Sequence, residues 1–270
     1  MLSPVYKQLI DIIKPYGKLC ISYSGGVDST FLARAAVDAL GPQNVLCVLI
    51  KGFALPSREY LNAVEYIKTI GARFDVLSVD EFKVEQFAAN TNDRCYYCKK
   101  FIFSRIFEFM KTQGFDTLAC GSNIDDLSDY RPGNKAVTEA GVVCPLIEAN
   151  LSKSQIRELS RQLLLPTADN PSSPCLASRV PYNQPVTRQK LQQIDAAEQF
   201  LCNLGFNELR VRHYGDTARI EVPANRIEEF VKLRSRVVEE FGNIGFTYIT
   251  LDLKGFRSGA MNEQLFAAGQ

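Results

Sequence analysis

Short apolar runs alternate with segments of helical periodicity over the first 120 residues of the chain. The runs predict buried strands at KLCISYS (18–24), NVLCVLI (44–50), RFDVLSV (73–79) and DTLACGS (116–122). Between them, apolar positions at helical spacing predict helices at 29–41, 57–70 and 96–112. Strands that alternate with helices in this way are typical of a doubly wound parallel α/β sheet, which binds ligands beyond the carboxyl ends of its strands.

A proline-marked stretch, NPSSPCLASRVPYNQP (170–185), interrupts this alternation. The segments that follow predict a helix at 187–204, strands at 208–213 and 217–222, a helix at 224–241 and a strand at 246–253. We therefore expect two domains, an α/β domain over 1–185 and a smaller α+β domain over 186–270.

Composition limits the classes of partner and compartment. The chain has 270 residues, of which 46% are hydrophobic, and its 31 basic and 30 acidic residues leave a formal charge of +1. This balance argues against a nucleic-acid partner, and the sequence has no apolar run near the roughly 20 residues that a membrane partner would require. The N-terminus has an aspartate and two prolines where a signal peptide would be continuously apolar, so we expect a cytoplasmic protein. Its eight cysteines then suggest free thiols or metal ligands.

The stretch ISYSGGVDSTFL (21–32) joins the first predicted strand to the first predicted helix. Gly25 and Gly26 allow backbone conformations closed to other residues, and the N–H groups of the helix start form an anion site. Three hydroxyl residues add donors: Ser24, Ser29 and Thr30. Asp28 beside a phosphate suits a bridging magnesium ion. The pattern indicates a phosphate-binding loop, although a simple capped turn would also use these residue types.

The second group of candidate residues is made of cysteines. Cys95 and Cys98 form a CxxC pair in DRCYYCKK, which is typical of a redox dithiol, half a zinc site or part of an iron–sulfur site. Cys175 lies in the loop segment SSPCLASR. Three thiolates can hold three irons of a 4Fe-4S cluster and leave the fourth open, but two helix-face thiols and an unrelated loop cysteine would give the same spacing. The remaining cysteines are predicted in strands (Cys20, Cys47 and Cys120) or a helix (Cys202), whereas Cys144 in VVCPLIE has no assignment.

SGGVDS lacks the Lys-Ser or Lys-Thr pair of a Walker loop and resembles the pyrophosphate-binding loop of the N-type ATP pyrophosphatases. Three further motifs follow it in order: GSNIDDLSDYRPG (121–133), NPSSPCLASRVPYN (170–183) and LDLKGFRSGAMNE (251–263). Together they resemble the LarE family, the ATP-dependent sulfur transferases that build the nickel-pincer cofactor of lactate racemase. The resemblance covers nearly the whole chain.

The resemblance implies that ATP and Mg²⁺ serve to adenylylate a carboxylate of pyridinium-3,5-biscarboxylic acid mononucleotide, which is then converted to a thiocarboxylate. One branch of the family consumes the cysteine that corresponds to Cys175, whereas the other carries a CxxC and a 4Fe-4S cluster that delivers sulfide from a donor. Cys95 and Cys98 favour the second branch. The family also implies a homo-oligomer, such as a hexamer.

Carried over to this chain, the resemblance assigns six residues to the ATP loop, with Asp28 as a magnesium contact: Ser24, Gly25, Gly26, Asp28, Ser29 and Thr30. Asp126 follows the fourth predicted strand, where it would contact magnesium or pyrophosphate or would cap a helix. Ser178 and Arg179 lie beside the sulfur site at Cys175 and are catalytic candidates with it, as is Asp28 in the loop. Arg179 and Arg257 are further candidates for contacting an anion. Arg210 and Arg212 alternate along a predicted strand, so they share one face that suits the phosphate of a mononucleotide or is simply solvated. His213, the one histidine, should face the other way.

Three other functions are compatible with the motifs. The first is cluster-dependent thiolation of tRNA, against which the near-neutral charge argues. The second is sacrificial sulfur transfer from Cys175. The third, from a different class, is a non-catalytic regulator that binds a nucleotide or metal.

Overall fold

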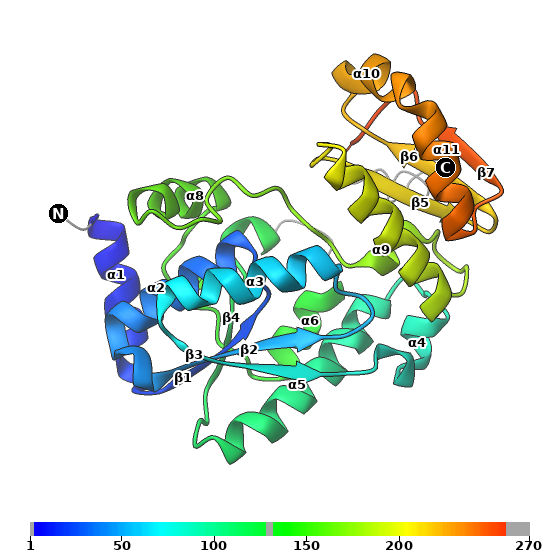
Figure 1. Cartoon of the computed structure of the whole chain (residues 1–270). Coiled ribbons are helices and arrows are strands. Elements are labelled where there is room, and N and C mark those ends of the chain that lie inside the picture. The colour runs from blue at the N-terminus through cyan, green and yellow to red at the C-terminus, as the bar shows by residue number, and fades with distance from the viewer. Residues whose placement is uncertain (1–2, 128–131, 258–270) are drawn as a thin grey trace. The chain divides into compact units, whose positions relative to one another are not determined.

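The structure is a computed structural model that describes residues 3–127 and 132–257. The chain forms two compact units (Figure 1). The N-terminal unit comprises Met1–Phe87 and Asp93–Ser173, and the C-terminal unit comprises Ala88–Asn92 and Pro174–Gln270. The sequence placed the boundary near 185, whereas the units divide before Pro174. The PCLASR segment belongs to the C-terminal unit because its Arg179 pairs with Glu198 in that unit.

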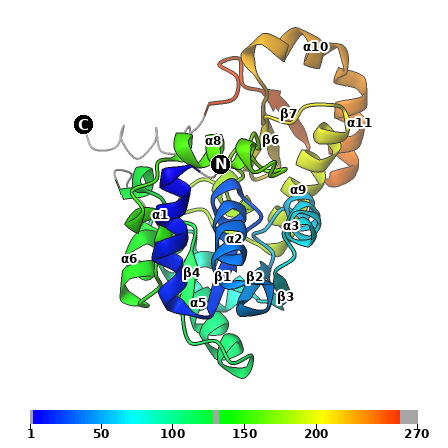
Figure 2. The same ribbon diagram turned by 90° about the vertical axis from the view of Figure 1, so that its left-hand side faces the viewer.

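A parallel sheet organises the N-terminal unit. Its strands follow the order β3-β2-β1-β4, which Figure 2 shows from the side. They are β1 (Leu19–Tyr23), β2 (Val45–Lys51), β3 (Arg73–Ser78) and β4 (Leu118–Cys120). All three pairings are parallel, with Leu19 beside Val45 and Cys20 beside Leu118. The predicted α/β fold is confirmed, and the strands lie within a residue or two of the predicted runs.

Helices cover both faces of this sheet. One face carries α1 (Pro4–Ile13), α2 (Val27–Leu40), α3 (Ser57–Ile70) and α8 (Lys153–Gln162), and the other carries α5 (Arg94–Thr112) and α6 (Pro132–Glu139). The unit also has two one-turn helices, α4 (Glu85–Ala88) and α7 (Pro145–Glu148). The three helices predicted between strands are confirmed as α2, α3 and α5. Their apolar residues face the sheet, as the periodicity requires.

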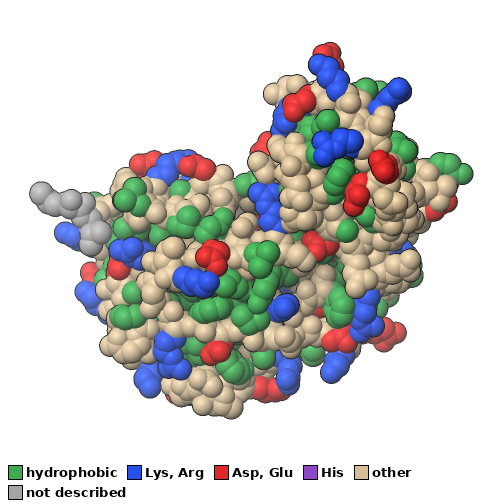
Figure 3. All heavy atoms as spheres, viewed as in Figure 1, with side chains coloured by type: hydrophobic (Ala, Val, Ile, Leu, Met, Phe, Trp, Pro, Cys, Tyr) green, Lys and Arg blue, Asp and Glu red, His purple; other side chains and the backbone are tan. Residues whose placement is uncertain are grey.

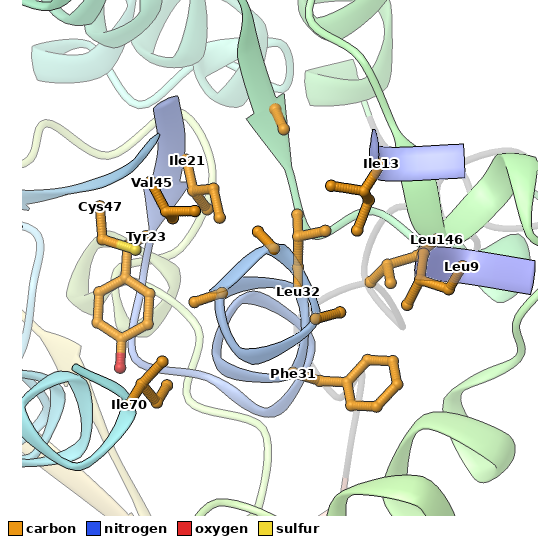
Figure 4. Close-up of a cluster of buried hydrophobic side chains, with 14 of the residues drawn as sticks. Leu9, Ile13, Ile21, Tyr23, Phe31, Leu32, Val45, Cys47, Ile70 and Leu146 are labelled. Atoms are coloured by element: carbon orange, nitrogen blue, oxygen red, sulfur yellow. The ribbon is translucent and has the colours of Figure 1, made fainter. Parts of the chain in front are cut away.

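The buried core fixes where α2 begins. Phe31 and Leu32 of α2 point into the cluster drawn in Figure 4, which also contains Leu9 and Ile13 of α1. All four side chains are fully buried, and each contributes about 1.5–3 kcal/mol relative to exposure. Since α2 is held against the sheet in this way, its first turn is fixed at the carboxyl end of β1, where the glycine-rich loop lies.

The C-terminal unit has a small mixed sheet, as the sequence predicts. Strand β5 (Arg210–Tyr214) is antiparallel to β6 (Thr217–Glu221), and β7 (Tyr248–Leu251) is parallel to β6. Three helices accompany it: α9 (Arg188–Asn203), α10 (Ile227–Lys232) and α11 (Arg234–Ile244). The single helix predicted at 224–241 is wrong, because the chain leaves helical geometry at Leu233 (φ −93°, ψ 6°). Neither glycine nor proline marks that break in the sequence.

The surface carries both signs of charge. Figure 3 shows acidic and basic side chains interspersed over the face that it displays. Among the described helices, none is long and apolar enough to cross a membrane.

Candidate active site

The loop between β1 and α2 is tied together by its own hydroxyl groups. The Oγ atoms of Ser24 and Ser29 lie 3.0 Å apart, and the Ser24 N–H donates to Ser29 Oγ at 3.2 Å. Ser29 Oγ donates to the carbonyl oxygen of Gly26, and the Gly26 N–H donates to Ser24 Oγ. Thr30 is fully buried beside the Tyr23 hydroxyl. The serines therefore hold the loop over the first turn of α2.

Glycine is required in this loop and beside it for steric reasons. Gly25 has φ +76°, and a Cβ atom there would lie 2.4 Å from Cβ of Ala63 in α3. Gly121 follows β4, and its Cβ would lie 2.8 Å from the backbone nitrogen of Ser29. Any side chain at either position would displace backbone. The carboxyl ends of β1 and β4 thus meet the start of α2 with little space between them.

The two carboxylate oxygens of Asp28, in the first turn of α2, have different surroundings. Oδ2 accepts a hydrogen bond from Lys153 Nζ at 2.6 Å, whereas Oδ1 is buried and has no partner among the described residues. A buried carboxylate oxygen without a partner is costly unless a cation or donor binds it. The residues therefore fit a magnesium ion, which prefers carboxylate and phosphate oxygens. The magnesium contact of Asp28 stays a prediction.

Lys153, at the start of α8, was missed by the sequence analysis. Its ammonium group contacts Asp28, and its backbone N–H donates to Oδ2 of Asp125 at 2.8 Å. A capping box between Ser152 and Gln155 fixes this helix start. The box is readable in the sequence as SKSQ, but its position beside a loop 125 residues earlier is not.

Asp126 lies in the 3₁₀ turn Ile124–Leu127 that follows β4. Its Oδ2 accepts a hydrogen bond from the backbone N–H of Asn123 at 3.0 Å, so this oxygen caps the turn. The predicted contact to magnesium or pyrophosphate stays a prediction for Asp126. Part of the 121–133 motif, residues 128–131, and the end of the 251–263 motif, residues 258–263, lie outside the described residues.

Cys175 is fixed through its backbone in the C-terminal unit. It precedes a 3₁₀ turn, Leu176–Arg179, and its carbonyl oxygen accepts hydrogen bonds from the Ser178 hydroxyl at 2.8 Å and from Arg179 Nη1 at 3.1 Å. Arg179 is 1% exposed and forms two parallel hydrogen bonds at 2.9 Å to the Glu198 carboxylate. Ser178 and Arg179, predicted beside the sulfur site, thus hold the Cys175 turn in place.

Arg210 and Arg212 lie on one side of β5, as alternation predicts. Arg212 is buried, and its Nε and Nη2 donate to the Glu221 carboxylate at 2.9 Å while Nη1 donates to the carbonyl oxygen of Ser178. Arg212 therefore does not lie on a solvated face. Burial, followed by the nearby Arg179 charge, lowers the pKa of Arg210 to about 10. The phosphate role of both arginines stays a prediction.

His213 belongs to the other side of β5. Its ring packs against Phe246 with centroids 5.2 Å apart, and Nε2 is hydrogen-bonded to Gln193. Burial, followed by the Lys190 charge, lowers the pKa of His213 to about 4. This histidine therefore stays neutral near pH 7.

The CxxC pair lies in the first turn of α5. Cys95 is exposed and Cys98 is half-buried, and three residues apart they share one side of the helix. They belong to the N-terminal unit, and Cys175 belongs to the C-terminal unit. Within residues 3–127 and 132–257, no group of three or more His, Cys, Asp or Glu side chains is placed to hold a metal ion.

Comparison with known proteins agrees with the loop geometry. The NAD synthase family model matches residues 9–106, from α1 into α5. An uncharacterized protein of Synechocystis sp. is 38% identical over 98% of this chain and 99% of its own length. Pyridinium-3,5-bisthiocarboxylic acid mononucleotide synthase of Lactiplantibacillus plantarum is 36% identical over 96% of this chain and 94% of its own length. The chain belongs to the LarE family.

More distant relatives fit the same assignment. An NH₃-dependent NAD⁺ synthetase of Chlorobaculum tepidum is 27% identical over 58% of both chains. Enzymes of the NAD synthase kind use ATP and form AMP and pyrophosphate, so this LarE-family chain is an ATP-using enzyme. The family resemblance predicted from the sequence motifs is confirmed.

Proposed function

We propose that this chain is an ATP-dependent sulfur transferase that converts pyridinium-3,5-biscarboxylic acid mononucleotide to its thiocarboxylate form. The observation that carries the proposal is the 36% identity, over 94% of its length, to the synthase of the bisthiocarboxylic acid mononucleotide. The geometry of the SGGVDS loop supports the ATP-dependent half of the reaction.

In the first step, a substrate carboxylate oxygen attacks the α-phosphorus of ATP, and pyrophosphate leaves. The N–H groups at the start of α2 and the exposed Ser24 hydroxyl are the donors for the departing pyrophosphate, while Ser29 holds the loop through Gly26. Lys153 adds a positive charge beside the loop. Asp28 Oδ1 would hold a magnesium ion, and such an ion would supply positive charge to neutralise the phosphates.

In the second step, sulfur attacks the activated carbonyl carbon, and AMP leaves with the former carboxylate oxygen. Adenylylation is necessary because a carboxylate oxygen is a very poor leaving group near pH 7. Cys95, Cys98 and Cys175 are the proposed ligands of a 4Fe-4S cluster, since three thiolates suit iron and leave one iron open. A cluster held by these thiolates would supply sulfide, obtained from a separate donor, for the attack.

The mononucleotide phosphate requires cationic donors, and Arg210 is the proposed contact. Burial and the neighbouring positive charge of Arg179 lower the pKa of Arg210. A bound phosphate would neutralise both positive charges, so this environment favours its binding. Arg212 supports this site indirectly, because it holds Glu221 and Ser178. We further propose a cytoplasmic homo-oligomer, such as a hexamer.

Product analysis tests the ATP-dependent step. The full-length protein, purified without oxygen, is incubated with ATP, Mg²⁺, sulfide and the biscarboxylic acid mononucleotide. We expect AMP, pyrophosphate and a thiocarboxylate product in equal amounts. Formation of ADP and phosphate would overturn the assignment, and thiolation of tRNA in place of the mononucleotide would favour the alternative function.

The source of sulfur is tested by intact-protein mass and variants. A cluster that delivers sulfide leaves the polypeptide unchanged, so the enzyme turns over repeatedly, and Cys95→Ala, Cys98→Ala and Cys175→Ala each lose iron and activity. A sacrificial mechanism needs only Cys175, stops after one sulfur and leaves the protein lighter by hydrogen sulfide. Dehydroalanine at position 175 in an active, iron-free preparation would refute the cluster and retain the sulfur-transferase assignment.

A further inference from the structure

Two cysteines outside the proposed sulfur site lie side by side at the end of β4. The segment around Val143 runs parallel to β4, with Ala119 paired to Val143. The Cys120 N–H donates to the Val143 carbonyl oxygen at 3.1 Å, and the Val143 N–H donates to the Leu118 carbonyl oxygen at 2.9 Å. This register makes Cys120 and Cys144 neighbours across the pair. Their Sγ atoms are 3.6 Å apart.

The backbone already has the spacing that a disulfide needs. Paired strands lie about 4.8 Å apart, within the range of roughly 4.4–6.8 Å found between the Cα atoms of bridged cysteines. Side chains directly opposite each other in a parallel pair point to the same side of the sheet. Closing the sulfur atoms from 3.6 Å to the S–S bond length of about 2.05 Å therefore requires side-chain rotations together with a small shift of the backbone at Cys120.

A hydrogen bond between the two thiols favours the thiolate form of one of them. The hydrogen bond from Cys144 lowers the pKa of Cys120 to about 6 against the opposing effect of burial, with help from Ser122 and the Lys99 charge, while the same bond raises the pKa of Cys144. The thiolate is the reactive form of cysteine. Burial has the opposite effect on the strand cysteine Cys20, whose pKa it raises to about 12.

We propose that Cys120 and Cys144 are an oxidation site at which hydrogen peroxide closes a reversible disulfide in the folded protein. The Cys120 thiolate attacks the peroxide, which gives a sulfenic acid and hydroxide. The Cys144 thiol then attacks the sulfenic sulfur, so the S–S bond forms and water leaves. Two electrons pass from the thiols to the peroxide, and a dithiol reductant reverses the change. This site goes beyond the proposed function, which uses neither thiol.

The disulfide acts on the ATP loop through Gly121. This residue follows Cys120 and lies so close to α2 that a Cβ atom on it would be 2.8 Å from the Ser29 nitrogen. Cys120 Sγ also lies 3.3 Å from the Ser122 hydroxyl, a contact that disulfide formation removes. Moving this segment displaces the first turn of α2, whose N–H groups bind phosphate. Oxidation therefore weakens ATP binding.

Peptide mapping of the full-length protein, purified without oxygen and treated with hydrogen peroxide, tests the oxidation site. We expect one linked peptide that contains Cys120 and Cys144 and is lighter by two hydrogen atoms than the separate thiols. The fully buried Cys20 and Cys47 serve as internal controls and react with an alkylating reagent only after unfolding. A Cys144→Ser protein should trap sulfenic acid at Cys120. Thiols at both positions after peroxide treatment, or sulfinic acid at Cys120 without the link, would overturn the proposal.

Equilibrium binding of Mg-ATP tests the effect on the loop. Peroxide should weaken ATP binding about three- to tenfold, the equivalent of losing one or two hydrogen bonds. A dithiol should restore it. Cys202→Ser, which removes a thiol of α9, should respond like the wild type, whereas Cys144→Ser should not respond. Equal responses in both variants would assign the effect to other cysteines, and a wild-type disulfide with unchanged affinity would refute the coupling to ATP.

Discussion

Asp28→Asn separates the proposed magnesium contact from a structural role. The substitution keeps the volume of the side chain and an acceptor for Lys153 but removes the negative charge. The Asp28–Lys153 ion pair is only partly buried, with side-chain exposures of 22% and 35%, so its contribution to folding is small. We expect a loss of about 0.5–1 kcal/mol in the free energy of unfolding.

The expected effect on magnesium is larger. Oδ1 of Asp28 is buried and has no partner among the described residues, so its charge is available to a cation. A charge-assisted contact is worth about 1.5–3 kcal/mol, which corresponds to roughly a ten- to hundredfold higher Mg²⁺ requirement. Pyrophosphate release at saturating ATP, measured against Mg²⁺ concentration, gives this requirement. Urea unfolding of the same preparations gives the stability.

Asp38→Asn is the matched control. Asp38 lies at the other end of α2, where its Oδ2 accepts a hydrogen bond from the Tyr6 hydroxyl at 2.8 Å and its Oδ1 accepts one from Arg34 at 2.9 Å. This variant should lose stability without a change in Mg²⁺ requirement. A wild-type requirement in Asp28→Asn, or equal shifts in the two variants, would refute the magnesium assignment.

Three further predictions concern other parts of the chain. Gly25→Ala should abolish ATP binding, because its Cβ would overlap α3. Gly17 has a φ of +66° but open space around it, so Gly17→Ala should cost only about 1–3 kcal/mol of stability; circular dichroism and nucleotide binding distinguish the two variants. Arg210→Ala should raise the mononucleotide KM about ten- to a hundredfold with little change in ATP binding, and an unchanged KM would remove Arg210 from the phosphate site. The pKa of His213 is lowered from 6.5 to about 4, so on acidification the unfolded chain binds a proton before the folded chain does. The free energy of unfolding should therefore fall by up to roughly 3 kcal/mol as the pH drops from 6.5 to 4. NMR titration of the single histidine would contradict this prediction if its pKa were near 6.5.

The fold was predictable because its signals are local. Each strand of the parallel sheet is a short apolar run, and each intervening helix shows its own period, so neither depends on distant residues. The Gly-Gly pair likewise predicts a turn, in which Gly25 has a φ of +76° that other residues rarely adopt. The split of 224–241 into α10 and α11 was not predictable, because no residue at Leu233 breaks a helix by its own preference.

The contacts that complete each site were not predictable because they join distant parts of the chain. Lys153 reaches Asp28 across 125 residues, and Cys144 reaches Cys120 across 24. Arg212 alternates with Arg210 as an anion-binding pair would, yet its donors are used by Glu221 and Ser178. A residue type and its spacing indicate what a side chain can bind, whereas tertiary packing decides which partner it meets.

The way Cys175 is held bears on both sulfur chemistries. Three donors converge on its carbonyl oxygen: the Ser178 hydroxyl, the Ser178 backbone N–H and Arg179 Nη1. Arg179 is in turn held by the buried pair with Glu198. These contacts fix the turn through the Cys175 backbone and do not use its sulfur atom. The thiol can then act either as an iron ligand or as a sulfur donor. Since Cys175 is necessary in both cases, Cys95 and Cys98 are the positions at which substitution distinguishes them.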